Sequence, residues 1–453
     1  MNVKGKKILI VGFGKTGVSA LNLLMPMGAI CAVQDTKSED KIDGKLLDML
    51  KNNNVKCYFG APPESSEKFD MLVMSPGVPT ELDFIQKLEQ SGSEIIGEVE
   101  LAFRFSKGKF VSITGTNGKT TVTTLVGEIF KNAKKDTFVV GNIGFPVTSV
   151  VHETKDDSWI ITETSSFQLE TIQGFKPYIS AFLNISPDHL DRYKNMQNYI
   201  NSKARIFEFQ DENDYFVVNY DDKAVYEVIS NCRAKVVPFS RLSELTFGVF
   251  VKDNKITVAD EKGELTEICG AKELLLIGGH NLENALASTA IAHFAGIPAD
   301  DIAKTLRTFT GVEHRVEFCG EIKGIRFIND SKGTNIDASV KAIEAIDGEI
   351  ILIAGGYDKK LEFDELIDAF TGKVRHMVLL GTTAKKIKET AESKGFYDNV
   401  ILNNMEECVN MAFELAKPGD TVLLSPACAS MDMYSSFEER GAHFKKCVAM
   451  LEK

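Results

Sequence analysis

The sequence predicts an α/β fold of three domains, and three observations support this. Short apolar strands alternate with segments of helical period almost throughout, which is typical of parallel sheets covered by helices on both faces. The chain has 453 residues, well above the roughly 100 to 200 that usually make one domain. Two strands run directly into glycine-rich turns. We therefore place the domains at residues 1–97, 98–311 and 312–453.

Each block is recognised by its strands. In the first block, residues 7–11 and 72–74 are short apolar runs followed by turns that contain glycine. The second block begins with a strand at 110–113, and its residues 249–276 predict an antiparallel insertion. The strands expected in the third block are 325–328, 350–354, 377–380 and 422–424.

Charge and cysteine content exclude several classes of protein. Acidic residues outnumber basic ones by 64 to 52, and the net charge of −12 disfavours nucleic acid and anionic lipid as partners. No apolar run approaches the roughly 18 residues of a membrane span, so we expect no membrane insertion. The eight cysteines are scattered without a C-x-x-C pair, which predicts reduced thiols in a cytoplasmic protein.

The first glycine motif, GFGKTG at residues 12–17, lies between a strand and a helical pattern. Its glycines allow a tight turn and a close backbone approach to a diphosphate, while the helix N-terminus attracts anions. Asp35 follows at the end of the next strand. The motif alone also suits a turn without a ligand. NAD is the default ligand, although any nucleotide diphosphate would satisfy the same physics.

The second motif, TGTNGKTT at residues 114–121, follows an apolar strand and opens an amphipathic helix, so it predicts a P-loop. Backbone N–H groups would cradle phosphates, Lys119 would reach the β and γ groups, and Thr120 would ligate Mg²⁺. Ile113 stands where the longer form of this motif has its first glycine. The residues predicted to bind ATP here are Gly115, Thr116, Asn117, Gly118, Lys119, Thr120 and Thr121.

Two further strand ends support a metal-phosphate centre. The strand at 159–162 ends in Glu163, and the strand at 179–183 is followed by Asn184 and then His189. Carboxyl ends of parallel strands share one edge of a sheet, so these groups converge with Lys119 and Thr120. Taken alone, Glu163 is more simply a solvated strand-end acid and His189 a capping residue. Their combination with the P-loop favours the metal site.

Several segments together resemble the Mur ligase family. Within that family, the resemblance is greatest to the ligases that add D-glutamate. They are the compact P-loop, ETSSFQL at 163–169, NISPDHLDR at 184–192, GHN at 279–281 with Asn284, HR at 314–315 and NDSK at 329–332. The resemblance spans the chain from Gly12 to the segment LSPACAS at 424–430. In combination these motifs are highly specific.

The resemblance implies a role for each domain. The N-terminal domain would be Rossmann-like and bind the UDP part of the substrate, the central domain would be a P-loop ATPase, and the C-terminal domain would be Rossmann-like and close over the site. The resemblance therefore implies that the first glycine motif binds a UDP-sugar and not NAD. The residues implied to bind this substrate are Thr16, Asp35, Thr36, Ser75 and Gly77, with Asn142 near the reacting end.

The implied activity is the ATP-dependent addition of D-glutamate to UDP-N-acetylmuramoyl-L-alanine (UDP-MurNAc-L-Ala) in peptidoglycan precursor synthesis. A carboxylate and an amine do not condense in water at useful rates, so ATP would activate the acid as an acyl phosphate, giving ADP and phosphate. Two Mg²⁺ ions are implied, one at Thr120 and Glu163 and one at His189 and Lys203. Lys203 matches a carbamylated lysine of the family. Lys119, His189 and Lys203 are the implied catalytic residues.

The remaining implied contacts concern ATP and the amino acid. Adenine and ribose contacts are implied for Asn281, Asn284, Arg315 and Asp330. D-Glutamate needs a positive group for its second carboxylate, and the amino-acid contacts are implied for Lys332, Thr334, Lys359, Ser430 and Phe437. Without the resemblance, Asn281 and Asn284 suit a helix cap and a surface amide, and Lys359 suits a solvated charge.

Three other interpretations stay open at this point. Another Mur-type ligase would add a different amino acid, but the chain lacks the Asp-Asn-Pro-Arg segment that marks the ligase for a diamino acid, which favours D-glutamate. A nicotinamide-dependent oxidoreductase would leave the P-loop unexplained. A nucleotide sensor or scaffold would bind the same ligands without turnover, so phosphate release distinguishes it from a ligase.

Overall fold

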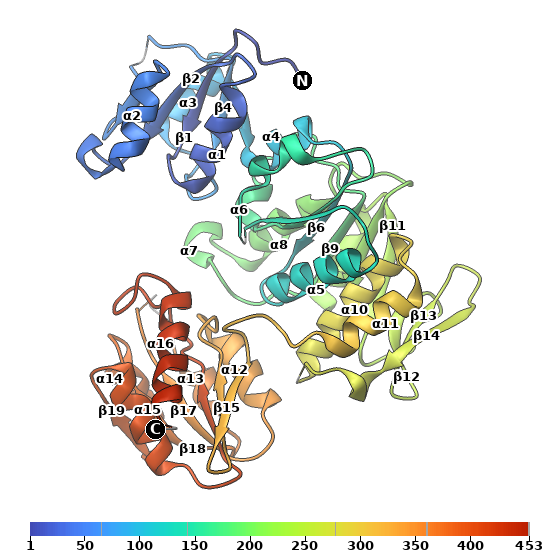
Figure 1. Ribbon diagram of the computed structural model, residues 1–453, viewed down its shortest axis with the longest axis vertical. Coiled ribbons are helices and arrows are strands. Elements are labelled where there is room, and N and C mark those ends of the chain that lie inside the picture. Colours follow the sequence, from blue (N-terminus) through green and yellow to red (C-terminus); the bar gives the residue numbers. More distant parts are fainter. Residues whose placement is uncertain (65, 143, 277, 359–360, 452–453) are drawn as a thin grey trace. The chain divides into compact units, whose positions relative to one another are not determined.

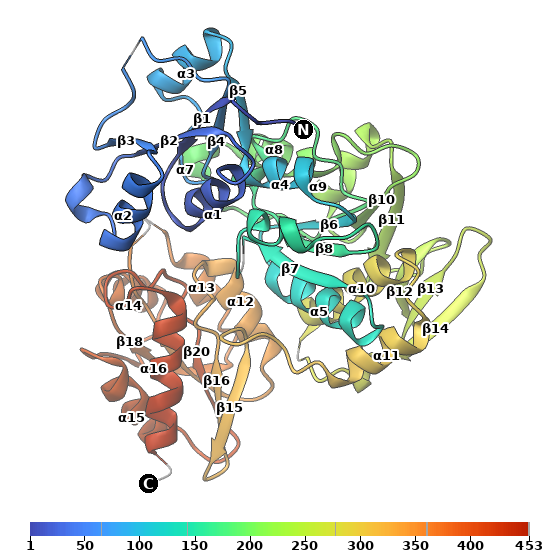
Figure 2. The same ribbon diagram turned by 45° about the horizontal axis from the view of Figure 1, so that its top comes forward.

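The computed structural model describes every residue except 65, 143, 277, 359–360 and 452–453. It contains three sheets with helices packed on them, as Figure 1 and Figure 2 show. The chain divides into two compact units, of which one comprises Met1–Ile268 with Leu286–Thr305 and the other Cys269–Ala285 with Leu306–Lys453. The predicted α/β class with mostly parallel sheets is confirmed. None of the described helices is long and apolar enough to cross a membrane.

The N-terminal sheet has five parallel strands in the order β3-β2-β1-β4-β5. Along β1, Ile8 and Ile10 enter one apolar core and Leu9 and Val11 enter another, because successive side chains of a strand point to opposite faces. The elements are β1 (Lys7–Val11), α1 (Lys15–Leu24), β2 (Ile30–Asp35), α2 (Gly44–Asn52), β3 (Lys56–Phe59), β4 (Met71–Met74), α3 (Asp83–Gln90), β5 (Glu94–Gly97) and α4 (Glu98–Phe105).

The middle sheet has nine strands in the order β14-β13-β12-β11-β10-β9-β6-β8-β7. Strands β12 and β13 pair antiparallel, as predicted for the insertion, whereas β7 to β11 pair parallel with β6 or with each other. The strands are β6 (Lys109–Thr114), β7 (Thr137–Gly141), β8 (Trp159–Glu163), β9 (Ile179–Phe182), β10 (Tyr215–Asn219), β11 (Lys235–Ser240), β12 (Gly248–Lys252), β13 (Lys255–Ala259) and β14 (Leu265–Gly270).

The helices that follow these strands carry much of the candidate site. Helix α5 packs against β7 and β8. The helices are α5 (Lys119–Asn132), α6 (Ser166–Leu169), α7 (Leu190–Tyr193), α8 (Met196–Ala204), α9 (Lys223–Tyr226), α10 (Gly279–Phe294) and α11 (Ala299–Thr308).

The third sheet has six strands in the order β15-β16-β20-β17-β18-β19, and β15 alone runs antiparallel to its neighbour. The sequence did not predict β15 or β19, because Gly320 and an irregular register interrupt β15 and β19 has three residues. The elements are β15 (Glu317–Ile322), β16 (Ile325–Asn329), α12 (Ile336–Ala345), β17 (Ile350–Ala354), α13 (Asp364–Asp368), β18 (Val374–Leu379), α14 (Ala384–Ser393), β19 (Asn399–Ile401), α15 (Met405–Leu415), β20 (Thr421–Leu424) and α16 (Phe437–Met450).

Candidate active site

The P-loop segment forms a tight turn between β6 and α5. Gly118, at the N-cap of α5, has φ of 81°, in the left-handed region that favours glycine. The Lys119 ammonium folds back over the turn and donates to the carbonyl oxygens of Gly115 at 2.9 Å and Thr116 at 2.8 Å. Asn184, just after β9, accepts the N–H of Asn117 at 2.9 Å. The adjacent strand thus fixes the loop that presents Lys119.

A carboxylate and a hydroxyl meet beside this turn. Glu163 ends β8 opposite Ile113 of β6 and is 2% exposed. Thr120 Oγ1 donates to Glu163 Oε2 at 2.8 Å, and Asn142 Nδ2 donates to Glu163 Oε1 at 2.8 Å. Neighbouring ligands of an octahedral Mg²⁺ lie about 2.9 Å apart, so the spacing of these two oxygens fits one ion. The structure therefore brings together the predicted first metal pair and the predicted substrate residue Asn142.

Lys203 is the most unusual charged residue of this region. It lies on α8, is 2% exposed, and donates from Nζ to Gly115 O at 2.8 Å. Burial lowers the pKa of Lys203 well below its ordinary value, and the nearby charge of Lys119 acts in the same direction. A neutral amine is the form that reacts with CO₂, so the environment suits carbamylation. The sequence alone would have made Lys203 a surface lysine.

Tyr199 connects Lys203 with the other predicted ligand of the second ion. Lys203 Nζ lies 4.7 Å from the centroid of the Tyr199 ring, and the His189 ring centroid lies 6.4 Å from it. His189 caps α7 with φ of 52°, and its Nε2 is 3.5 Å from Asp188 Oδ2. The sequence analysis did not single out Tyr199. Its position one helical turn before Lys203 could have indicated that the two side chains lie together.

No three His, Cys, Asp or Glu side chains gather as a preformed metal site in the described part of the chain. A divalent cation beside the P-loop would therefore complete its coordination with hydroxyl, water and phosphate oxygens, as Mg²⁺ commonly does. The donor set of Thr120 and Glu163 agrees with that hard-oxygen chemistry.

The first glycine motif also forms the predicted turn, between β1 and α1. Ser75, after β4, donates from Oγ to Gly12 O at 2.8 Å, and Asp35 Oδ2 accepts the N–H of Phe13 at 2.7 Å. A Cβ on Gly17 would lie 2.2 Å from Gly12 O, so the turn requires glycine there. The predicted residues Ser75 and Asp35 thus lie at the turn. Thr36 and Gly77 are exposed on the loops after β2 and β4, and Thr16 is in the first turn of α1.

A hydrogen-bonded cluster joins α1 and α4 to the segment after β7, and the sequence did not reveal it. Glu98, at the start of α4, accepts at Oε1 from the N–H of Thr148 at 2.6 Å and from its hydroxyl at 2.7 Å. The Thr148 hydroxyl is also 2.7 Å from Ser19 Oγ of α1. Burial raises the pKa of Glu98. Asn142 directly follows β7, and Thr148 lies further along in a short 3-10 helix, Val147–Ser149.

The predicted adenine and ribose residues lie in the second compact unit. Asn281 and Asn284 are buried on α10, with Asn284 Nδ2 donating to Asn281 Oδ1 at 3.1 Å. Burial raises the pKa of Asp330 to about 7, although the charge of Arg315 opposes this rise. Burial also lowers the pKa of His280 to about 4, and the charge of Arg315 contributes. Arg315 therefore lies near both the Asn281 segment and Asp330.

The predicted amino-acid residues gather at the carboxyl edge of the third sheet. Lys332 follows β16, Ser430 follows β20, and Phe437 opens α16. Lys332 Nζ lies 5.2 Å from the centroid of the Phe437 ring, and Thr334 N–H donates to Lys332 O at 2.8 Å. Ser430 is buried. Lys359 lies outside the described residues.

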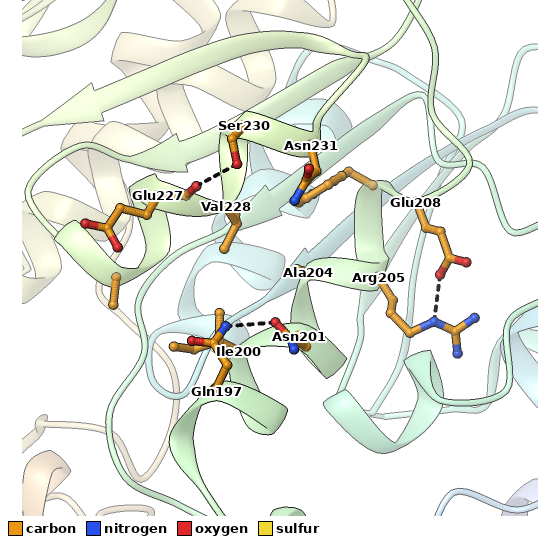
Figure 3. Close-up of a pocket in the computed structure, with 12 residues that line it drawn as sticks. Gln197, Ile200, Asn201, Ala204, Arg205, Glu208, Glu227, Val228, Ser230 and Asn231 are labelled. Carbon is orange, nitrogen blue, oxygen red and sulfur yellow. Dashed lines mark hydrogen bonds and ion pairs between the residues drawn. The ribbon is translucent and has the colours of Figure 1, made fainter.

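A pocket of about 580 Å³ is lined by residues of α8 and of the segment 224–231, as Figure 3 shows. Gln197 and Asn201 line it from α8 and are hydrogen-bonded to each other at 2.9 Å, while Arg205 pairs with Glu208 at 2.6 Å. At 100° per residue, Gln197 and Asn201 lie on the face of α8 that points away from Lys203. Of the predicted site residues that the structure describes, none lines this pocket.

Comparison with known proteins gives three family models that match successive parts of the chain. They are the Mur ligase MurD-like N-terminal domain at residues 6–97, the Mur ligase middle domain at 113–292, and the Mur ligase, glutamate ligase domain at 314–428. The three matches follow the order of the three sheets.

Individual relatives match over full length. The UDP-N-acetylmuramoylalanine–D-glutamate ligase of Thermoanaerobacter sp. (strain X514) is 48% identical, and that of Alkaliphilus oremlandii (strain OhILAs) is 50% identical, each covering 100% of both chains. Among solved structures, the UDP-N-acetylmuramate-alanine ligase of Thermotoga maritima has a TM-score of 0.61 at 18% identity and covers 99% of this chain and 100% of its own. This last similarity concerns the fold.

Proposed function

The chain belongs to the Mur ligase family, and from this premise we propose that it is the ATP-dependent ligase that adds D-glutamate to UDP-MurNAc-L-Ala in peptidoglycan precursor synthesis. Full-length relatives at 48% and 50% identity carry the D-glutamate ligase name. One structural observation supports the chemistry most strongly: Lys119 and Lys203 both donate to Gly115 O beside the Thr120–Glu163 pair.

The reaction divides into two displacements. An oxygen of the L-alanyl carboxylate attacks the γ-phosphorus of ATP, and the bond to ADP breaks. The D-glutamate amine then attacks the acyl carbon, and phosphate leaves with its electron pair while the amine loses a proton. Phosphoryl transfer depends chiefly on position and charge neutralisation. The turn from Gly115 to Thr121 would hold the phosphates, and the Lys119 ammonium would neutralise charge on the β and γ groups.

The metal assignments belong to this proposal. Thr120 and Glu163 would hold one Mg²⁺, and His189 with carbamylated Lys203 would hold a second. Bound Mg²⁺ would supply positive charge to the phosphate oxygens. Carbamylation replaces an ammonium by an anionic oxygen ligand. The buried position of Lys203 and its lowered pKa support that modification.

The substrate assignments divide among the domains, for which we propose the boundaries 1–97, 98–311 and 312–453. The turn at Gly12–Gly17 would take the UDP moiety, with Asp35 and Ser75 beside it and Asn142 near the reacting carboxylate. Asn281, Asn284, Arg315 and Asp330 would contact adenosine. Lys332, Thr334, Lys359, Ser430 and Phe437 would contact D-glutamate. The eight unpaired thiols support a cytoplasmic location.

A substrate panel tests this proposal. The purified protein is given ATP, Mg²⁺ and UDP-MurNAc-L-Ala with D-glutamate, L-glutamate, L-alanine, glycine or a diamino acid, and phosphate and product are both measured. We expect turnover with D-glutamate and little with the others. Turnover with another amino acid alone would show a different Mur-type ligase. Absence of turnover in every combination, with retained nucleotide binding, would leave only a nucleotide-binding protein.

A further inference from the structure

Arg440, on α16, is 2% exposed, and its guanidinium gathers backbone and hydroxyl oxygens from two loops. Nε donates to Ser331 Oγ at 3.0 Å, and Nη2 donates to Ser331 O at 2.7 Å. Nη1 and Nη2 each donate to Cys428 O at 3.1 Å, and Nη1 donates to Ala429 O at 3.3 Å. One side chain thus holds the loop after β16 against the loop after β20.

All of these acceptors are neutral. No ion pair joins Arg440 to a carboxylate among the residues that the structure describes. Burial lowers the pKa of Arg440 to about 10, so the side chain keeps its charge at neutral pH. A buried charge is costly unless it is paired or fully hydrogen-bonded. The five hydrogen bonds of Arg440 offset that cost, and they use the planar fork of the guanidinium, which a lysine ammonium does not have.

The two loops carry the residues assigned above to the amino acid. Lys332 follows Ser331 directly, and Ser430 follows Ala429 directly. The third segment is the start of α16 itself, where Phe437 O accepts the Ser331 hydroxyl at 2.8 Å. Lys332, Ser430 and Phe437 thus stand on three segments whose mutual placement is fixed through Ser331 and Arg440.

A fourth segment approaches the same guanidinium. Gly356, just after β17, has φ of 148°, and a Cβ there would lie 3.1 Å from Arg440 Nη1 and 2.3 Å from Ala429 O. Gly356 lies in the loop that follows β17. Glycine at 356 therefore lets this loop come close to the fork of Arg440.

We propose that Arg440 is the positioning residue of the amino-acid site: its buried guanidinium sets the spacing of the loops that carry Lys332 and Ser430, and thereby selects an amino acid with a second carboxylate. This inference rests on the proposed function. It assigns Arg440 no contact with substrate, because its five hydrogen bonds all go to the protein.

The test compares Michaelis constants for the three substrates in R440M and R440K with those of the wild type. R440M keeps a long side chain but loses every donor, and we expect the KM for D-glutamate to rise about ten- to hundredfold, the loss of one or two hydrogen bonds from a charged donor. The KM for UDP-MurNAc-L-Ala should stay within about twofold. R440K, with fewer donors and no fork, should recover part of the loss.

Arg375 provides the matched control. It lies near the start of β18 in the same sheet and also joins two segments, donating from Nη2 to Leu415 O at 2.7 Å and to Asp420 at 2.6 Å. Because the starts of parallel strands lie at the edge opposite their ends, R375M should lower thermal stability without a selective change in the KM for D-glutamate. If R440M does not fold, R440K and R375M complete the comparison.

The outcomes separate the two proposals. A selective rise in the KM for D-glutamate in R440M or R440K, absent from R375M, supports the positioning role. Equal changes in all three Michaelis constants, or the same loss of stability as in R375M with an unchanged KM for D-glutamate, would overturn it. A wild-type enzyme that makes no product with D-glutamate would overturn the proposed function and this inference together.

Discussion

The two glycine turns of this chain have the same backbone plan but different surroundings. Each follows a buried strand and opens a helix, β1 to α1 and β6 to α5. In the first turn, the carboxylate at the end of the neighbouring strand, Asp35, accepts a backbone N–H of the turn itself. In the second turn, the corresponding carboxylate, Glu163, accepts a side-chain hydroxyl instead, and two lysines lie against the loop.

In the proposed mechanism each turn would bind phosphate, and the residue that ends the neighbouring strand would decide whether phosphoryl transfer also occurs. A carboxylate that is hydrogen-bonded to the turn makes the turn more rigid. Such a turn suits a ligand that is bound without being chemically changed. A carboxylate paired with a hydroxyl presents two oxygens to a metal ion, and adjacent lysines neutralise transferred charge. A glycine motif by itself therefore does not distinguish binding from phosphoryl transfer.

The largest effect is expected at Lys119. In the proposed mechanism, no residue of the first turn has a corresponding role in phosphoryl transfer. K119A should lower phosphate release by about a hundredfold to a thousandfold, because the charge proposed to neutralise the β and γ groups of ATP is lost. Binding of UDP-MurNAc-L-Ala should be nearly unchanged. Phosphate-release kinetics check the expected loss of turnover. Calorimetry checks that the nucleotide sugar still binds. Wild-type turnover in K119A would remove the distinction between the turns.

The next largest effect is expected at Lys203. K203A should lower turnover by about a hundredfold, because the carbamate oxygen proposed as a metal ligand would be lost. Added formate or acetate should restore part of the rate by supplying such an oxygen. Rates measured over a series of carboxylate concentrations check this. A variant that no small carboxylate rescues would remove the carbamate while leaving the ligase assignment in place.

A smaller effect is expected in the first turn, where a substitution should weaken binding of the nucleotide sugar and leave the use of ATP unchanged. In G17A the new Cβ would meet Gly12 O, so the turn must shift, and the KM for UDP-MurNAc-L-Ala should rise about tenfold. The KM for ATP should not change. G44A, on the exposed start of α2 with open space around the added Cβ, is the control. Equal changes in both Michaelis constants would mean that the two turns do not act separately.

The smallest effect concerns Glu98, whose carboxylate is hydrogen-bonded to Thr148. Its pKa is raised by burial above the ordinary 4.5. Between 4.5 and the raised pKa, the folded state binds a proton that the unfolded state releases, so the free energy of unfolding falls as pH rises. E98Q, which is neutral at all pH values, should flatten this dependence of the free energy of unfolding on pH.

Denaturant unfolding followed by the fluorescence of Trp159, the single tryptophan, checks this between about pH 5 and pH 8. D136N, a change at another acidic residue of the same compact unit, is the control for general loss of negative charge. Parallel pH profiles for the wild type and E98Q would contradict the raised pKa of the buried Glu98 carboxyl.

Most strands that position the site could be predicted from the sequence, because buried parallel strands are continuous apolar runs. The strand expected at 350–354 coincides with β17, and the strand expected at 110–113 lies within β6 (Lys109–Thr114). The short strand β19 and the irregular β15 could not be predicted, since their apolar pattern is weak. The turn chemistry of residues 114–121 follows from local sequence, so it too was predictable.

Long-range partners were not predictable in the same way. Nothing local distinguishes Lys203 from a surface lysine, and its burial depends on the carbonyl of Gly115, 88 positions earlier in the chain. The contact of Glu98 with Thr148 and the fork of Arg440 around Ser331 likewise join segments far apart in the sequence. Such contacts require the packed fold, and only the family resemblance indicated Lys203 beforehand.

The transfer of isotope from substrate to phosphate tests the central claim most directly. UDP-MurNAc-L-Ala labelled with ¹⁸O in the alanyl carboxylate is converted with ATP and D-glutamate, and the phosphate is analysed by mass spectrometry. If the carboxylate attacks the γ-phosphorus at the P-loop, one labelled oxygen leaves in the phosphate. Phosphate that carries only unlabelled oxygen would contradict activation of the acid by ATP.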